Sequence, residues 1–237
     1  RDLIVTGVQT CALPIWDYLE LPFAIHWYRW YDSAQGGMPH FVVKKGVVEN
    51  IRKLHESGIR VKAYIDTRLW SEVDGPGYKS DWEFTAKGKN CAVINADGTC
   101  NYERYHKDCR EVVMCPCAAL WQEKIFELTR RTASYGFDMI YHDQVGASRP
   151  FICYAKDHGH DLNSNTAWVD GYYRMFDKLV PLRRTFPELC HNTEDANDAY
   201  LPLFDGFLPW RWTEENQIPL FAAVYSGYTQ IGRASCR

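Results

Sequence analysis

The chain of 237 residues is 46% hydrophobic and 24% charged, which is enough apolar material for one large folded core. Its formal net charge of −3 provides no basic field for nucleic acid or for an anionic membrane surface, so we expect neither partner. No apolar stretch of the sequence is long enough to cross a bilayer. The composition therefore indicates a single globular domain that does not act on nucleic acid.

Both ends of the chain differ in character from the rest. Residues 1–15 (RDLIVTGVQTCALPI) and residues 231–237 (IGRASCR) resemble conceptual translations of sequencing adapters, although the first segment also has the β-branched residues of a genuine strand. We expect both segments to be non-native and residues 16–230 to form one partial domain. A native start lying upstream would also hold any signal peptide.

The first half of the chain alternates short apolar runs with helical patterns, as in βα units. We predict a strand at residues 23–28, a helix at 47–57 that stops at Gly58, and a second strand at 59–65. Residues 66–110 are rich in Gly, Asp, Asn and Lys with little periodicity, which indicates a long excursion above the sheet. A third strand is expected at residues 111–114.

The second half continues the alternation. We predict a helix at 118–135 with Leu120 and Trp121 facing inward, a strand at 137–141, a long loop at 143–165 and a helix at 167–184. Further strands are expected at 189–193, 204–208 and 220–225, the last of seven. This pattern favours an α/β fold of the (β/α)8 TIM-barrel type, truncated at both ends. A doubly wound open sheet is the competing architecture.

Acidic residues cluster where the predicted strands end, which is where the reacting groups of such barrels stand. Asp143 follows the strand at 137–141, and Glu194 follows the strand at 189–193. Cleavage of a glycosidic bond requires two flanking carboxyl groups, and we predict these two as the catalytic pair. The alternative is that they cap neighbouring helices or pair with arginines.

Histidines and cysteines raise the question of a metal. His158 and His160, one residue apart, could hold a metal together with a carboxylate, although ligand binding or loop structuring is the favoured role. Outside the suspect ends there are seven cysteines, and the close pair Cys115 and Cys117 is separated by a proline that disfavours a zinc knuckle. We expect no metal ion, no organic cofactor and no obligatory disulfide framework.

Several motifs together resemble an uncharacterised family of bacterial barrel domains from gut and polysaccharide-degrading bacteria, distantly similar to retaining α-glycosidases. The motifs are HWYRWYD (26–32), KAYIDTRLW (62–70), MCP (114–116) followed by Trp121, YHDQVGA (141–147), CYAKDHGH (153–160) and NTED (192–195). The resemblance implies a secreted, periplasmic or cell-surface glycosidase with Asp143 as nucleophile and Glu194 as acid/base. It also implies that Asp205 steadies the sugar.

The sequence thus predicts a two-carboxylate, retaining glycoside hydrolase acting on an oligo- or polysaccharide. The 9 tryptophans and 15 tyrosines suit stacking against sugar faces as well as burial. The predicted substrate-binding residues are His26, Trp27, Tyr28, Asp66, Arg68, Trp70, His158, His160, Asp205 and Trp210. The alternatives are a metal-dependent hydrolase using His158, His160 and Asp143, and a non-catalytic glycan-binding barrel.

Overall fold

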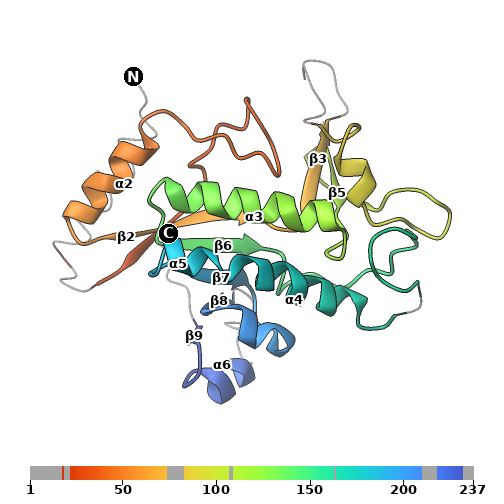
Figure 1. Cartoon of the computed structure of the whole chain (residues 1–237). Coiled ribbons are helices and arrows are strands. Elements are labelled where there is room, and N and C mark those ends of the chain that lie inside the picture. Colours follow the sequence, from red (N-terminus) through yellow and green to blue (C-terminus); the bar gives the residue numbers. More distant parts are fainter. Residues whose placement is uncertain are drawn as a thin grey trace.

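The centre of the fold is a curled, six-stranded parallel sheet (Figure 1). The structure, a computed structural model, describes Tyr18 and residues 22–73, 83–106, 109–162, 164–209 and 218–231. The strands are β1 (Ala24–Trp27), β2 (Arg60–Asp66), β6 (Met139–Asp143), β7 (Cys190–Glu194), β8 (Gly206–Leu208) and β9 (Gln230–Ile231). Each strand pairs in parallel with the next.

The order of these strands separates the two predicted architectures. They follow one another across the sheet in chain order, β1-β2-β6-β7-β8-β9. A doubly wound sheet reverses its strand order at a switch point, and the described strands show no such reversal. The described part of the chain is therefore a half-barrel, and a closed eight-stranded barrel is not formed by these residues alone.

Helices α2 (Val47–Glu56), α3 (Ala119–Ser134) and α4 (Ala167–Leu179) complete the βα units. Figure 1 shows α3 and α4 side by side in front of β6 and β7. Glycines in the left-handed conformation follow α2 and α3, Gly58 with φ 76° and Gly136 with φ 98°, because glycine adopts positive φ without steric cost. Each helix thus ends where the next strand has to begin.

A second, three-stranded antiparallel sheet lies beside the parallel one. It consists of β3 (Leu69–Val73), β5 (Cys109–Val113) and β4 (Tyr102–His106), in that spatial order, with the short helix η1 (Gly88–Cys91) between β3 and β4 in the chain. The predicted excursion at residues 66–110 contains β3, η1 and β4. The strand predicted at 111–114 was wrongly assigned to the parallel sheet, because it pairs antiparallel with β3 in this small sheet.

Two further elements differ from the prediction. Residues 220–225 form helix α6 (Leu220–Tyr225) and not a strand, since a short apolar run fits either state and Pro219 directly precedes it. The helix predicted at 167–184 divides into α4 and α5 (Leu182–Thr185) around Pro181. A short helix η2 (Asp198–Leu203) connects β7 to β8.

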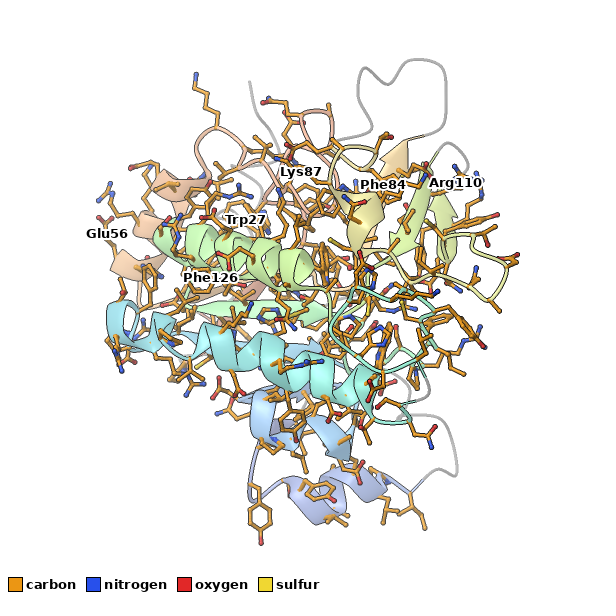
Figure 2. All side chains as sticks on the ribbon, turned by 45° about the vertical axis from the view of Figure 1, so that its right-hand side comes forward. Trp27, Glu56, Phe84, Lys87, Arg110 and Phe126 are labelled. Carbon is orange, nitrogen blue, oxygen red and sulfur yellow. The ribbon has the colours of Figure 1, made fainter. Side chains whose placement is uncertain are left out.

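The main core lies between the parallel sheet, its helices and the small sheet. Trp30, Trp70 and Trp121 are fully buried in it. Phe84 and Arg110, labelled in Figure 2, lie at the end of the molecule that carries the small sheet. Among the described residues, no helix combines the length and apolar character needed to span a membrane.

Neighbouring residues of α3 allow a test of this packing. Trp121 is fully buried against Trp70, with ring centroids 5.9 Å apart, whereas Leu120 is 43% exposed, contrary to the prediction that it faces inward. We expect Trp121→Ala to lower the free energy of unfolding by about 3–5 kcal/mol and Leu120→Ala by less than about 1 kcal/mol. Urea denaturation of both variants measures the difference. Equal losses would contradict the described orientation of α3.

Candidate active site

The carboxyl ends of β2, β6 and β7 bring three acidic residues together. Asp66 pairs with Asp143 in the β2–β6 register, and Tyr141 pairs with Asn192 in the β6–β7 register, which sets Glu194 beside Asp143. Side chains alternate along a strand, so residues two apart share a face. The three carboxyl groups therefore lie on one face, together with the side chains two residues before each of them: Tyr64, Tyr141 and Asn192.

Asp143 occupies the middle of this group. The Tyr64 hydroxyl donates a hydrogen bond of 2.8 Å to its Oδ2. Burial raises the pKa of Asp143, and hydrogen-bonding interactions with Tyr64, Tyr141 and Glu194 oppose that rise. Glu194 therefore interacts with Asp143 from the neighbouring strand, and the arrangement suits a proton donor next to an ionised carboxylate.

Asp66 is the most enclosed of the three acids. It is fully buried, and its Oδ1 accepts hydrogen bonds from the backbone N–H groups of Arg68 (2.8 Å) and Leu69 (2.7 Å). Its Oδ2 has no hydrogen-bond partner within the described ranges. Burial first, and the nearby charge of Asp143 second, raise the pKa of Asp66 well above its ordinary value. Asp66 thus costs stability whenever it is ionised.

Aromatic rings surround the carboxyl groups on the same face. The Tyr28 ring, 48% exposed, stacks on Tyr64 at 4.5 Å between centroids, and the His26 ring lies 4.7 Å from the Tyr141 ring. Deeper on this face, the Lys62 ammonium lies 5.7 Å from the Tyr141 ring, and burial lowers the pKa of Lys62 to about 8. The partly exposed Tyr28 offers a flat surface next to Asp143.

Tyr64, Tyr141 and Lys62 were not predicted as site residues, although the sequence pattern that locates them was present. The period-two alternation that places Asp66 and Asp143 on one face places Tyr64 and Tyr141 there as well. Counting back two residues from each strand-end acid finds Tyr64 and Tyr141, and counting back four residues from Asp66 finds Lys62.

The same alternation corrects two predicted sugar contacts. Trp27 is 4% exposed on the opposite face of β1 from its neighbours His26 and Tyr28, and it packs against Phe137. Trp70 is fully buried in β3 against Trp121. Both rings fill the core, Trp27 because it alternates with His26 and Tyr28 along the chain, and Trp70 because β3 belongs to the small antiparallel sheet.

Arg68 is also buried, at 1% exposure, and its guanidinium donates to Gln144 (2.8 Å) and Glu103 (2.7 Å). It links the segment after β2 to the segment after β6 and to the small sheet. Through these bonds Arg68 holds together the segments on which Asp66 and Asp143 lie, and its predicted contact with a sugar stays a prediction.

Asp205 lies at the wrong end of the sheet for its predicted role. It immediately precedes β8, at the amino end, where its carboxylate accepts from Arg183 (2.9 Å) and from the backbone N–H of His191 (2.7 Å). The prediction that Asp205 steadies a sugar beside Asp143 is therefore wrong, since parallel strands separate their two ends. Trp210, another predicted contact, lies outside the described residues.

His158 and His160, from the motif at residues 153–160, lie close to two cysteines. His158, 4% exposed, and His160 lie with Cys115 and Cys153 in a group whose ligand atoms are all within 4.8 Å of one another. Asp143 is not a member of this group. The buried position of His158 argues against its predicted contact with a sugar, and the metal-dependent hydrolase built on these histidines and Asp143 loses its geometric basis.

Comparison with known proteins gives the chain a family. Residues 6–233 match the family described as domain of unknown function DUF6259. The chain belongs to this family. Among curated relatives of this DUF6259 chain, a Bacteroides thetaiotaomicron protein named "Putative glycoside hydrolase" is 28% identical over 221 residues, 87% of the chain and 32% of that protein. A Monosiga brevicollis protein, "Putative glycoside hydrolase 22789", is 22% identical over 228 residues, which are 86% of the chain and 19% of that protein.

Solved structures resemble the DUF6259 chain in fold. The ligand-free α-N-acetylgalactosaminidase NagBb from Bifidobacterium bifidum has a TM-score of 0.66 at 15% identity, over 86% of this chain and 32% of that one. The α-galactosidase TtGalA from Thermus thermophilus has a TM-score of 0.58 at 15% identity, over 98% of this chain and 43% of that one. The predicted resemblance to bacterial glycosidase barrels is confirmed, and the chain spans less than half of each of these proteins.

The raised pKa of Asp66 leads to a test of the site's electrostatics. A carboxyl group whose pKa is higher in the folded state binds its proton more tightly there, so its contribution to stability falls as pH rises from about 4, the pKa of an unfolded Asp. Asp66→Asn removes this loss and keeps the Oδ1 acceptor for the two backbone N–H groups. At pH 7 we expect the variant to be more stable than the wild type by about 1–3 kcal/mol.

Urea unfolding between pH 4 and pH 8 measures this effect. The stability advantage of Asp66→Asn should grow as pH rises and disappear toward pH 4. An identical pH dependence for wild type and variant would show that Asp66 is not the buried, uncompensated acid described here.

Proposed function

We propose that this chain is part of a glycoside hydrolase in which Asp143 is the nucleophile and Glu194 the general acid/base. The observation that carries the proposal is the meeting of these two carboxyl groups, on neighbouring parallel strands, beside the Tyr64 hydroxyl. The names of the curated relatives and the glycosidase fold of the solved structures support the same class of enzyme.

The chemistry follows from the roles of the two groups. The Asp143 carboxylate attacks the anomeric carbon and forms a glycosyl ester while Glu194 donates its proton to the departing glycosidic oxygen. The Glu194 carboxylate then takes a proton from water, whose oxygen displaces Asp143 from the sugar. The hydrogen bond from Tyr64 stabilises the ionised form of Asp143, which is the form that attacks.

The proposal requires the two carboxyl groups to lie on either side of the scissile bond when a sugar binds. Retaining glycosidases hold the pair about 5–5.5 Å apart, with the scissile bond between the two carboxyls. A sugar entering beside Tyr28 would replace the Glu194 contact and leave the Tyr64 hydrogen bond in place.

Variants of the pair test this proposal with aryl α-galactosides and aryl α-N-acetylgalactosaminides, chosen because the structural neighbours are named for those sugars. We expect Asp143→Asn to reduce kcat by about 10⁴-fold or more while sugar binding, measured by calorimetry, persists. Glu194→Gln should slow substrates with poor leaving groups more than substrates with good ones, because only the former need a proton.

Asp205→Asn serves as the matched control, an acid at the other end of the sheet, and should leave kcat of the folded protein unchanged. Turnover that survives Asp143→Asn would overturn the proposal. Sugar binding by the wild type without turnover of any glycoside would instead favour a glycan-binding barrel.

The Tyr64 hydrogen bond predicts a shift in pH dependence. Tyr64→Phe removes a donor that lowers the pKa of Asp143, so that pKa rises further. Since the ionised form is the nucleophile, the acidic limb of the kcat/KM profile should move to higher pH. Tyr173→Phe, whose hydroxyl donates to the backbone oxygen of Ala199, is the control and should leave the profile in place. An unmoved acidic limb in Tyr64→Phe would contradict the role given to Asp143.

A further inference from the structure

A group of soft metal-binding side chains lies outside the carboxylate site. Cys115 stands between β5 and α3, and Cys153, His158 and His160 stand in the long segment between β6 and α4. One ligand atom from each of the four lies within 4.8 Å of all the others. Cys115, Cys153 and His158 are buried, and His160 is partly buried.

The donor set and spacing fit zinc. Two thiolates and two imidazoles are a common set for a structural zinc ion, and their two negative charges balance Zn²⁺. With Zn–S near 2.3 Å and Zn–N near 2.0–2.1 Å, a sulfur and a nitrogen on one tetrahedron lie about 3.6 Å apart. Cys153 Sγ and His158 Nδ1 are 3.5 Å apart. The widest separation in the group, 4.8 Å, needs a contraction of about 1 Å.

Each histidine has one nitrogen committed and the other available. The Nε2 of His158 lies 2.9 Å from the backbone oxygen of Asn90, so this nitrogen carries the proton and the lone pair of Nδ1 faces Cys153. The Nδ1 of His160 lies 3.2 Å from the backbone oxygen of Asp161. Its Nε2 is buried and has no hydrogen-bond partner among the described residues. A backbone carbonyl on the outer nitrogen is the usual way of orienting a metal-bound imidazole.

The backbone between the histidines is shaped for this convergence. Gly159 has φ +73°, a conformation that side-chain-bearing residues rarely adopt, and its carbonyl accepts a 3.0 Å hydrogen bond from Arg174 of α4. The residues on either side, His158 and His160, have ring centroids 6.1 Å apart. The turn therefore presents both rings to the same small volume.

Cys117 is a further buried thiol that the group leaves out. Its Sγ lies 2.9 Å from the backbone oxygen of Ala167 and 3.1 Å from Arg174 Nη2. These contacts hold it against α4. Because Cys117 is the same residue type two positions from Cys115, it supplies a matched control.

We propose that Cys115, Cys153, His158 and His160 together bind one zinc ion in a closed tetrahedral site that anchors the segment between β6 and α4 to the start of α3. Binding releases the two thiol protons to solvent and leaves the histidines neutral. A pocket lined in part by Cys115, Cys153 and His160 provides the path for the ion. All four positions are filled by protein, so the ion stabilises structure and binds no substrate.

The test uses the whole chain, purified with reductant, with ZnCl₂ and CoCl₂ as the probes. We expect one zinc per chain by elemental analysis, and cobalt loading should produce a thiolate-to-metal charge-transfer band together with the visible absorption of tetrahedral Co²⁺. Chelation should lower Tm, and added zinc should restore it.

Cys115→Ser and Cys153→Ser should each weaken zinc binding by more than about 100-fold, whereas Cys117→Ser should bind zinc like the wild type. Because the first two variants could misfold, the cobalt spectrum of the wild type stands as an independent readout of the thiolate ligands. Three outcomes would overturn the proposal: no metal bound by the reduced wild type, a cobalt spectrum without thiolate bands, or a metal-free Cys115–Cys153 disulfide found by mass spectrometry in the protein as isolated.

Discussion

The in-register hydrogen bonding of β2, β6 and β7 is the constraint on which the candidate site depends. It holds Asp66, Asp143 and Glu194 at one level, on one face, at the carboxyl edge of the sheet. A shift of one residue in either pairing would turn a carboxyl group to the opposite face and disperse the group. The register is maintained by burial, because the alternate residues of the same strands pack against the helices.

The site stores unfavourable electrostatics that the surrounding fold has to offset. Asp66 is buried, Asp143 is partly buried, and the charge of Asp143 raises the pKa of Asp66, while the Tyr64 hydroxyl and the backbone N–H groups after Asp66 compensate in part. Such costs are typical of functional sites, where local rules are broken and stability is supplied elsewhere. Here the core around Trp30, Trp70 and Trp121 supplies it.

The long segment between β6 and α4 links the candidate active site to the proposed zinc site. It starts at Asp143, the last residue of β6, and carries three of the four proposed zinc ligands before α4 begins. A segment of this length without regular structure would lose much conformational entropy on ordering, and a metal cross-link reduces that loss by constraining the chain. The proposed zinc ion would thus fix the path of the chain as it leaves Asp143.

The sequence by itself determined the βα alternation, the parallel strands at the centre and the strand-end positions of Asp143 and Glu194, because local periodicity records which side of each element is buried. Only the tertiary structure decided which strands pair. It placed the strand predicted at residues 111–114 in the antiparallel sheet, placed Asp205 at the opposite edge of the parallel sheet, and brought Cys115 and Cys153 close together. These outcomes depend on contacts between residues tens of positions apart, and no local pattern of apolar and polar residues encodes which distant partner a segment meets.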